Sequence, residues 1–127
     1  MFGDEIKPGQ IIIKNHNVLR AILERQYSPL LIDIICDQAK EHGCVITSAY
    51  RENDSGVHGH MRGIDTRSWC YPDGKEYMIM DQINKRWEYD PKRHKKLCSK
   101  IHRVKKNGKE GGIHFHNQVH PNTRRRT

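Results

Sequence analysis

The stretch from Gly112 to Val119 is the feature that most limits what this chain can fold into. Two sets of side chains alternate along it, with His114, His116 and Gln118 in one set and Ile113, Phe115, Asn117 and Val119 in the other. Successive side chains of a β-strand project to opposite faces. The alternation therefore predicts a strand that turns two histidines to one face and packs the other face on a core. Residues 100–104 and a glycine-bearing loop at 105–111 complete a predicted hairpin.

Two or three helices are expected upstream of the hairpin. Asn15 or Asn17 can cap a short helix that runs through Gln26, and Ser28-Pro29 opens a second helix that stops at Gly43. Apolar residues recur at helical spacing in the second segment and again in a third, from Glu76 to Trp87. These patterns predict amphipathic helices packed on a flat partner.

Two further strands are predicted at 44–50 and 63–69, where β-branched residues are common and turn-forming residues follow. With the hairpin they make a small antiparallel β-sheet flanked by two or three helices, which is a single α+β domain. We assign this domain to residues 1–121 and treat residues 122–127 as a basic C-terminal tail. At 127 residues the chain is long enough to bury a core of its own.

The formal net charge of +8 predicts attraction to a polyanion, but charge alone does not choose which one. The positive residues concentrate at 92–109 and in the tail Arg124-Arg125-Arg126, which can equally be a solvated end. The charge gives no reason to expect a specific nucleic-acid partner. A nuclease of the ββα-metal type would need a helix after the paired histidines, and the short tail leaves no room for one.

The cysteines and the N-terminus exclude several classes of protein. Cys36, Cys44, Cys70 and Cys98 form no C-x-x-C pair, which argues against a zinc ribbon or a thioredoxin-type site. Apolar surroundings predict that Cys36 and Cys44 are buried free thiols. Residues 1–10 lack the features of a secretory signal, and no run is long enough to span a membrane, so we expect a protein made in the cytoplasm.

Histidine and aspartate spacing indicates a metal site. A catalytic zinc takes three His or carboxylate ligands and keeps one position for water. His58 and Asp65, with one histidine of the hairpin, can supply that set. His114 and His116 lie two apart on a strand and point the same way, so the one that does not bind the metal is placed to act as a general base.

Three runs together resemble one family. They are Thr47-Ser48-Ala49-Tyr50-Arg51, then Ser55-Gly56-Val57-His58-Gly59-His60-Met61-Arg62-Gly63-Ile64-Asp65, and Gly112-Ile113-His114-Phe115-His116. In this order they resemble the signature of the zinc D-Ala-D-Ala carboxypeptidases and the related phage endolysin peptidases, which include L-alanyl-D-glutamate peptidases. The likeness covers the middle and C-terminal parts of the chain.

The resemblance implies a role for each matching residue. His58, Asp65 and His116 would bind Zn²⁺, His114 would act beside the metal, and Arg51 would position the substrate. His60 competes with His58 as first ligand, but only His58 has the six-residue interval to Asp65, so His60 is expected to support the ligands or face the substrate, as is Ser55. Many members carry glutamate as general base where this chain has Ile113, which leaves His114 or Glu110 for that role, and we favour His114.

The resemblance also implies a function. The expected activity is hydrolysis of a peptide bond in bacterial peptidoglycan, as a carboxypeptidase or as an endopeptidase. The stem peptide would be the substrate, the anionic cell wall a binding surface, and a holin-type partner the means of release for a phage lysis enzyme. The alternative is a non-catalytic basic binding module or phage structural module that retains the peptidase fold. A non-haem iron oxygenase also uses two histidines and one carboxylate, but its barrel needs a longer chain.

Overall fold

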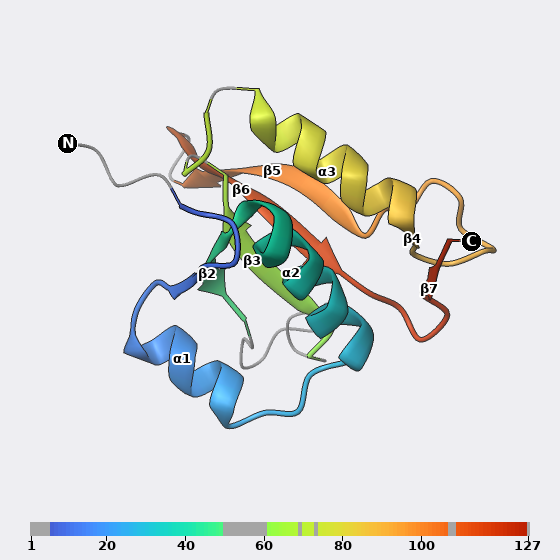
Figure 1. The fold of residues 1–127 in the computed structure, drawn as a ribbon, viewed down its shortest axis with the longest axis horizontal. Coiled ribbons are helices and arrows are strands. Elements are labelled where there is room, and N and C mark those ends of the chain that lie inside the picture. The colour runs from blue at the N-terminus through green and yellow to red at the C-terminus, as the bar shows by residue number, and fades with distance from the viewer. Residues whose placement is uncertain (1–5, 50–60, 69, 73, 107–108, 127) are drawn as a thin grey trace.

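The three-dimensional structure is a computed structural model that describes residues 6–49, 61–68, 70–72, 74–106 and 109–126. Its elements, in chain order, are β1 (Ile11–Ile13), α1 (His16–Leu23), α2 (Pro29–His42), β2 (Cys44–Ser48), β3 (Gly63–Arg67), α3 (Lys75–Arg86), β4 (Trp87–Glu88), β5 (Ser99–Lys106), β6 (Lys109–Gln118) and β7 (Arg124–Arg125) (Figure 1).

A five-stranded sheet in the order β1-β2-β3-β6-β5 forms the centre of the molecule. The pairs β2–β3, β3–β6 and β6–β5 are antiparallel, whereas the edge strand β1 lies parallel to β2. A second sheet consists of the short strands β4 and β7. The predicted α+β fold is confirmed. The sheet is mixed rather than purely antiparallel, because the short edge strand β1, which was not predicted, runs parallel to β2.

The helix boundaries follow the capping residues of the sequence. Asn15 caps α1, and its side-chain oxygen accepts a hydrogen bond from the Val18 amide at 3.0 Å. The helix ends at Leu23 instead of reaching the predicted Gln26. Helix α2 begins with Pro29 in its first turn and ends at Gly43, whose φ of +76° suits a residue without a side chain.

The hydrophobic core lies between the sheet and helices α2 and α3, which cover one face of the sheet in Figure 1. Phe115 and Val119 are fully buried, as the alternation from Gly112 to Val119 predicts. They pack in one cluster with Leu31 and Ile34 of α2 and with residues of α3. The histidine-bearing face of β6 therefore points away from these two helices.

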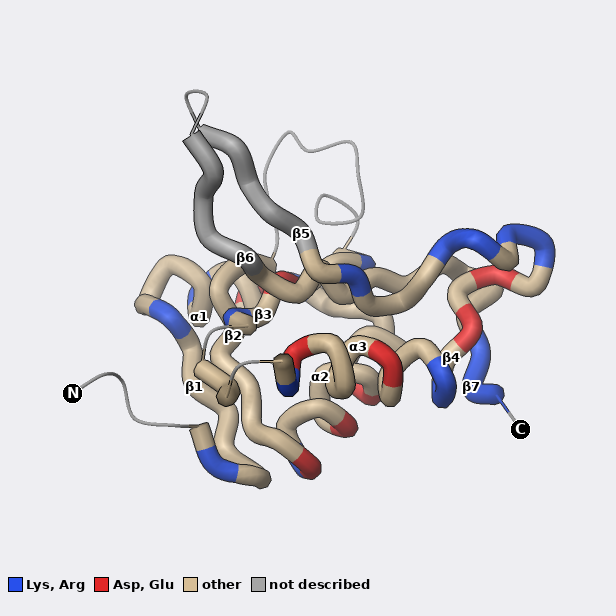
Figure 2. Tube along the Cα trace, turned by 90° about the horizontal axis from the view of Figure 1, so that it is seen from above, with Lys and Arg blue, Asp and Glu red and all other residues tan. Residues whose placement is uncertain are grey.

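The basic C-terminus packs against the rest of the chain. Arg124 and Arg126 form ion pairs with Glu88 at 2.9 and 3.2 Å, and Arg125 lies over the Trp87 ring, 5.3 Å from its centroid. Figure 2 shows these positive residues gathered at one end of the molecule, near the loop that carries Lys92. Part of the tail charge is thus neutralised by contacts with its own chain.

All four cysteines are free thiols, but their burial differs from the prediction in one case. Cys44 is buried, as expected, and so is Cys98. Cys36 is exposed, so the prediction that it is buried was wrong. Cys36 follows the buried Ile35 on α2. Successive residues of a helix point in different directions around its axis, so Cys36 faces the surface while Ile35 faces the core.

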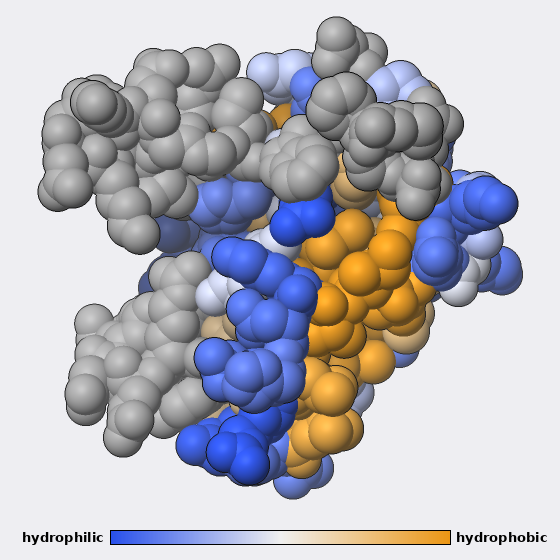
Figure 3. Space-filling view, turned by 90° about the vertical axis from the view of Figure 1, so that its left-hand side faces the viewer, coloured by the Kyte–Doolittle hydropathy of each residue, from blue (hydrophilic) through white to orange (hydrophobic). Residues whose placement is uncertain are grey.

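Several apolar side chains remain at the surface. Ile11 and Ile12 of β1 and Leu19 and Leu23 of α1 are exposed, and Figure 3 shows an apolar area beside a hydrophilic band on the side of the molecule where these elements lie.

Within the described ranges, no helix combines the length and the apolar character needed to cross a membrane.

Candidate metal centre

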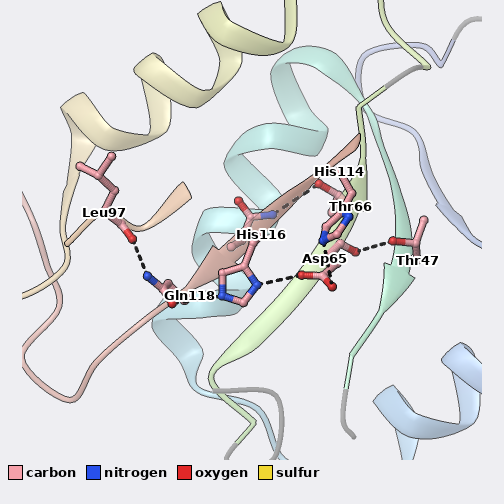
Figure 4. A network of polar contacts seen from close by, with 8 residues as sticks. Thr47, Asp65, Thr66, Leu97, His114, His116 and Gln118 are labelled. Atoms are coloured by element: carbon pink, nitrogen blue, oxygen red, sulfur yellow. Dashed lines mark hydrogen bonds and ion pairs between the residues drawn. The ribbon is translucent and has the colours of Figure 1, made fainter. Parts of the chain in front are cut away.

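Strands β3 and β6 bring Asp65, His114 and His116 together. In their antiparallel register Asp65 lies directly opposite His116, and Arg67 lies opposite His114. Directly opposed residues project to the same face of a sheet. The aspartate and both histidines therefore share the face that α2 and α3 do not cover, where Figure 4 shows the three side chains converging.

The Asp65 carboxylate is the centre of this cluster. Its Oδ1 lies 2.9 Å from His116 Nδ1, and its Oδ2 lies 3.6 Å from His114 Nε2. Asp65 is only 3 % exposed, while the two histidine side chains remain partly accessible at 19 % for His114 and 13 % for His116. A carboxylate this deeply buried must be paired with a positive group or with hydrogen-bond donors. The two imidazole rings occupy that position.

A hydrogen-bonded relay fixes the orientation of the His116 ring. The Leu97 carbonyl can only accept a hydrogen bond, so the Gln118 Nε2 donates to it at 2.9 Å. This contact turns Gln118 Oε1 toward His116 Nε2, which lies 3.1 Å away. An amide oxygen accepts, so the proton of a neutral His116 ring belongs on Nε2.

The relay leaves the other ring nitrogen, Nδ1, facing the carboxylate of Asp65. With the proton on Nε2, Nδ1 presents a lone pair, and an ionised carboxylate oxygen also presents only lone pairs. Two such atoms at 2.9 Å repel each other unless a positive species lies between them. A positive charge between the two atoms, either a proton or a metal cation, satisfies both lone pairs.

The arrangement fits zinc in its donor types and nearly in its distances. Nitrogen and carboxylate oxygen are both zinc ligands, and two ligand atoms of a tetrahedral zinc are roughly 3.3 Å apart, given metal–ligand distances of about 2.0–2.1 Å. The separation of 2.9 Å between His116 Nδ1 and Asp65 Oδ1 would need to widen by a few tenths of an ångström.

Two of the three predicted metal ligands are therefore adjacent. The third, His58, lies outside the described residues, as do Arg51, His60 and Ser55. In the part of the chain that the structure covers, no three His, Cys, Asp or Glu side chains are grouped so that they could hold a metal ion together. A complete three-residue site on this face thus depends on His58, or on His60.

The backbone of β6 separates the two candidates for general base. Glu110 lies opposite Lys105, four residues along the strand from His114. At about 3.3 Å per residue, its Cα is roughly 13 Å from that of His114. His114 Nε2, by contrast, lies 3.6 Å from a carboxylate oxygen of Asp65. Of these two residues, His114 is the one that the structure places beside the Asp65 carboxylate.

A second polar network holds the same strands from the other side of the sheet. Thr66 of β3 accepts hydrogen bonds from Asn117 of β6 and from Gln38 of α2, both at 3.4 Å, and Gln38 also donates to the Tyr71 hydroxyl at 2.9 Å. Tyr71 in turn donates to the Gly43 carbonyl, and burial raises the pKa of its hydroxyl, which keeps that proton in place. The strands that carry Asp65 and His116 are therefore anchored to α2.

Neither Gln118 nor Leu97 was predicted to have a role in the site. Gln118 belongs to the polar set of the alternating strand, so its position on the histidine face was foreseen. Its partner was not, because Leu97 precedes β5 and is 21 residues away in the sequence. Such a contact follows from the hairpin register and leaves no local sequence signal.

Comparison of the chain with models of protein families, with curated proteins and with solved structures finds no match.

Proposed function

We propose that this chain is a zinc-dependent peptidase that hydrolyses a peptide bond in bacterial peptidoglycan. The observation that carries the proposal is the contact between Asp65 Oδ1 and His116 Nδ1 at 2.9 Å, with His116 Nε2 engaged by Gln118. A cation between these two atoms satisfies both lone pairs. The substrate class rests on the resemblance of the surrounding motifs to zinc D-Ala-D-Ala carboxypeptidases and phage endolysin peptidases.

The residues of the candidate site bind the metal, transfer protons or position the substrate in the proposed reaction. Asp65, His116 and His58 hold the metal, which supplies a Lewis acid that activates water and polarises the scissile carbonyl. His114 Nε2 accepts a proton from the attacking water and then delivers one to the leaving amine. Arg51 positions the substrate through its planar guanidinium, which pairs with a carboxylate or carbonyl group.

The net positive charge of the chain suits action at the cell wall. The net charge of +8 favours adsorption to an anionic cell wall. Action at the wall after synthesis in the cytoplasm requires a release step, for which a holin-type partner is the proposed agent. The bond that is cleaved lies in the stem peptide or cross-bridge.

The test is digestion of purified cell-wall sacculi and of synthetic stem peptides by the zinc-loaded protein, with products identified by mass spectrometry. We expect wild type to release new amino groups and Asp65→Asn to lose at least about 100-fold in rate, because catalytic stabilisation by a metal amounts to several kcal/mol. Asp90→Asn is the matched control, since Asp90 also contacts a histidine, His120, at 3.7 Å, but neither residue belongs to β3 or β6. Wall binding without any cleavage would instead indicate a basic binding module.

A further inference from the structure

Lys100 of β5 lies beside the candidate metal centre. Its register partner is His116, whose partner on the opposite side is Asp65, so the three residues form a row across β5, β6 and β3. The flanking residues Ser99 and Ile101 face the core side, as Ser99 is fully buried and Ile101 packs against the cluster. Alternation along the strand therefore places Lys100 on the same face as Asp65 and His116.

The ion pairs of the described residues leave the charge of Lys100 unbalanced. None of the ion pairs among the described residues includes it. Lys100 is half-buried, and this burial, together with the neighbouring positive charge of Lys96, lowers the pKa of its ammonium group. A half-buried cation next to a second cation is stabilised by any anion that binds there.

We propose that Lys100 binds a carboxylate of the substrate, and that the substrate is a peptide with a carboxylate on a residue that flanks the scissile bond. This inference rests on the proposed peptidase function. Adjacent strands lie about 4.8 Å apart, so the Lys100 Cα is roughly 5 Å from that of His116 and about 10 Å from that of Asp65.

The Lys100 side chain can bridge the distance to a substrate group one residue away from the metal. A peptide spans about 3.3–3.6 Å per residue, so a carboxylate one residue away from a carbonyl at the metal falls within reach of the flexible lysine stem. The terminal carboxylate of a D-alanine or the free carboxylate of a D-glutamate in a stem peptide meets this requirement. Lys100 would thus select acidic peptides on the β5 side of the centre, independently of Arg51.

The experiment compares two stem peptides that are identical except for a carboxylate or a carboxamide on the flanking residue. We expect wild type to favour the carboxylate peptide by about 10- to 100-fold in kcat/KM, as is usual for a charge-assisted hydrogen bond. Lys100→Ala should lose this preference through a higher KM for the carboxylate peptide, with zinc content unchanged. Lys100→Arg should restore most of the preference.

The control is Lys40→Ala, which removes the same charge from the exposed surface of α2 on the other side of the sheet. It should keep the full preference for the carboxylate peptide. If Lys100→Ala also keeps it, or if wild type cleaves both peptides equally, Lys100 is not the carboxylate-binding residue, although the peptidase function stands. If zinc-loaded wild type cleaves neither peptide, the proposed function and this inference both fail.

Discussion

The contact between Gln118 and the Leu97 carbonyl determines which nitrogen of His116 faces Asp65. A carbonyl accepts and an amide nitrogen donates, so the direction of each hydrogen bond along the relay follows from the identity of its first member. Partners of this kind orient a metal-binding imidazole and fix its tautomer. Gln118 is accordingly a positioning residue for His116 in the proposed site.

Substitution of Gln118 by leucine should weaken zinc binding by about 10- to 100-fold, because the His116 ring loses the acceptor for its Nε2 proton. Competition with a chromogenic chelator measures the affinity, and long-range ¹H–¹⁵N NMR spectra of the zinc-loaded protein identify the protonated nitrogen of His116. The control is Gln82→Leu, which removes an amide from another histidine, His42, at 2.7 Å. Equal zinc affinities for wild type and Gln118→Leu would contradict the relay.

The buried and the exposed thiols should differ in reactivity. Burial raises the pKa of Cys44 and of Cys98 to about 12, whereas Cys36 is exposed. A raised pKa leaves almost no thiolate, the reactive form, at about pH 8. We therefore expect iodoacetamide to modify Cys36 first and to reach Cys44 and Cys98 only after guanidinium unfolds the protein.

Peptide mapping by mass spectrometry follows the thiol modification, with Cys36→Ser as the variant that should lose the early product. Modification of Cys44 or Cys98 in the native protein as fast as that of Cys36 would show that these thiols are not buried.

Among the secondary-structure elements, the junction between α2 and β2 depends on one glycine. Gly43 ends α2 with a φ of +76° and a ψ of 160°, a region essentially restricted to glycine. A side chain there would also collide with the Lys7 carbonyl and the Ile6 side chain. The junction matters for the site because β2 pairs with β3, which carries Asp65.

Gly43→Ala should lower the free energy of unfolding by about 2–4 kcal/mol, through backbone strain and the collision together. Gly74→Ala is the matched control, since Gly74 also has a positive φ, +86°, but an added Cβ would meet nothing within 4 Å. That variant should lose only about 1–2 kcal/mol. Urea denaturation measures both values, and equal losses would show that the close approach at Gly43 has no energetic effect.

The elements themselves were largely predictable, for local reasons. Asn15, Pro29 and Gly43 affect only the backbone close to them, so the start and end of these helices can be predicted from the sequence. The alternation through Phe115 correctly separated the core face from the histidine face. The short strands β1, β4 and β7 were not predicted, because two or three residues carry no periodicity and their pairing depends on distant segments.

At the scale of the whole molecule, the candidate site was predictable only in part. The approach of Asp65 to His114 and His116 was expected, and the described residues place the three side chains together. The positions of Lys100 and Leu97 depend on the register of β5 against β6, which shifts between Arg103 and Lys105. Register is set by the folded hairpin as a whole, so these two residues had no signal in the sequence.

The central claim is that Asp65 and His116 share a zinc ion, and elemental analysis of the purified protein tests it most directly. Wild type and Asp90→Ala should each contain about one zinc per chain, and Asp65→Ala should contain almost none while keeping its circular dichroism spectrum. Zinc absent from wild type, or present equally in wild type and Asp65→Ala, would contradict the claim.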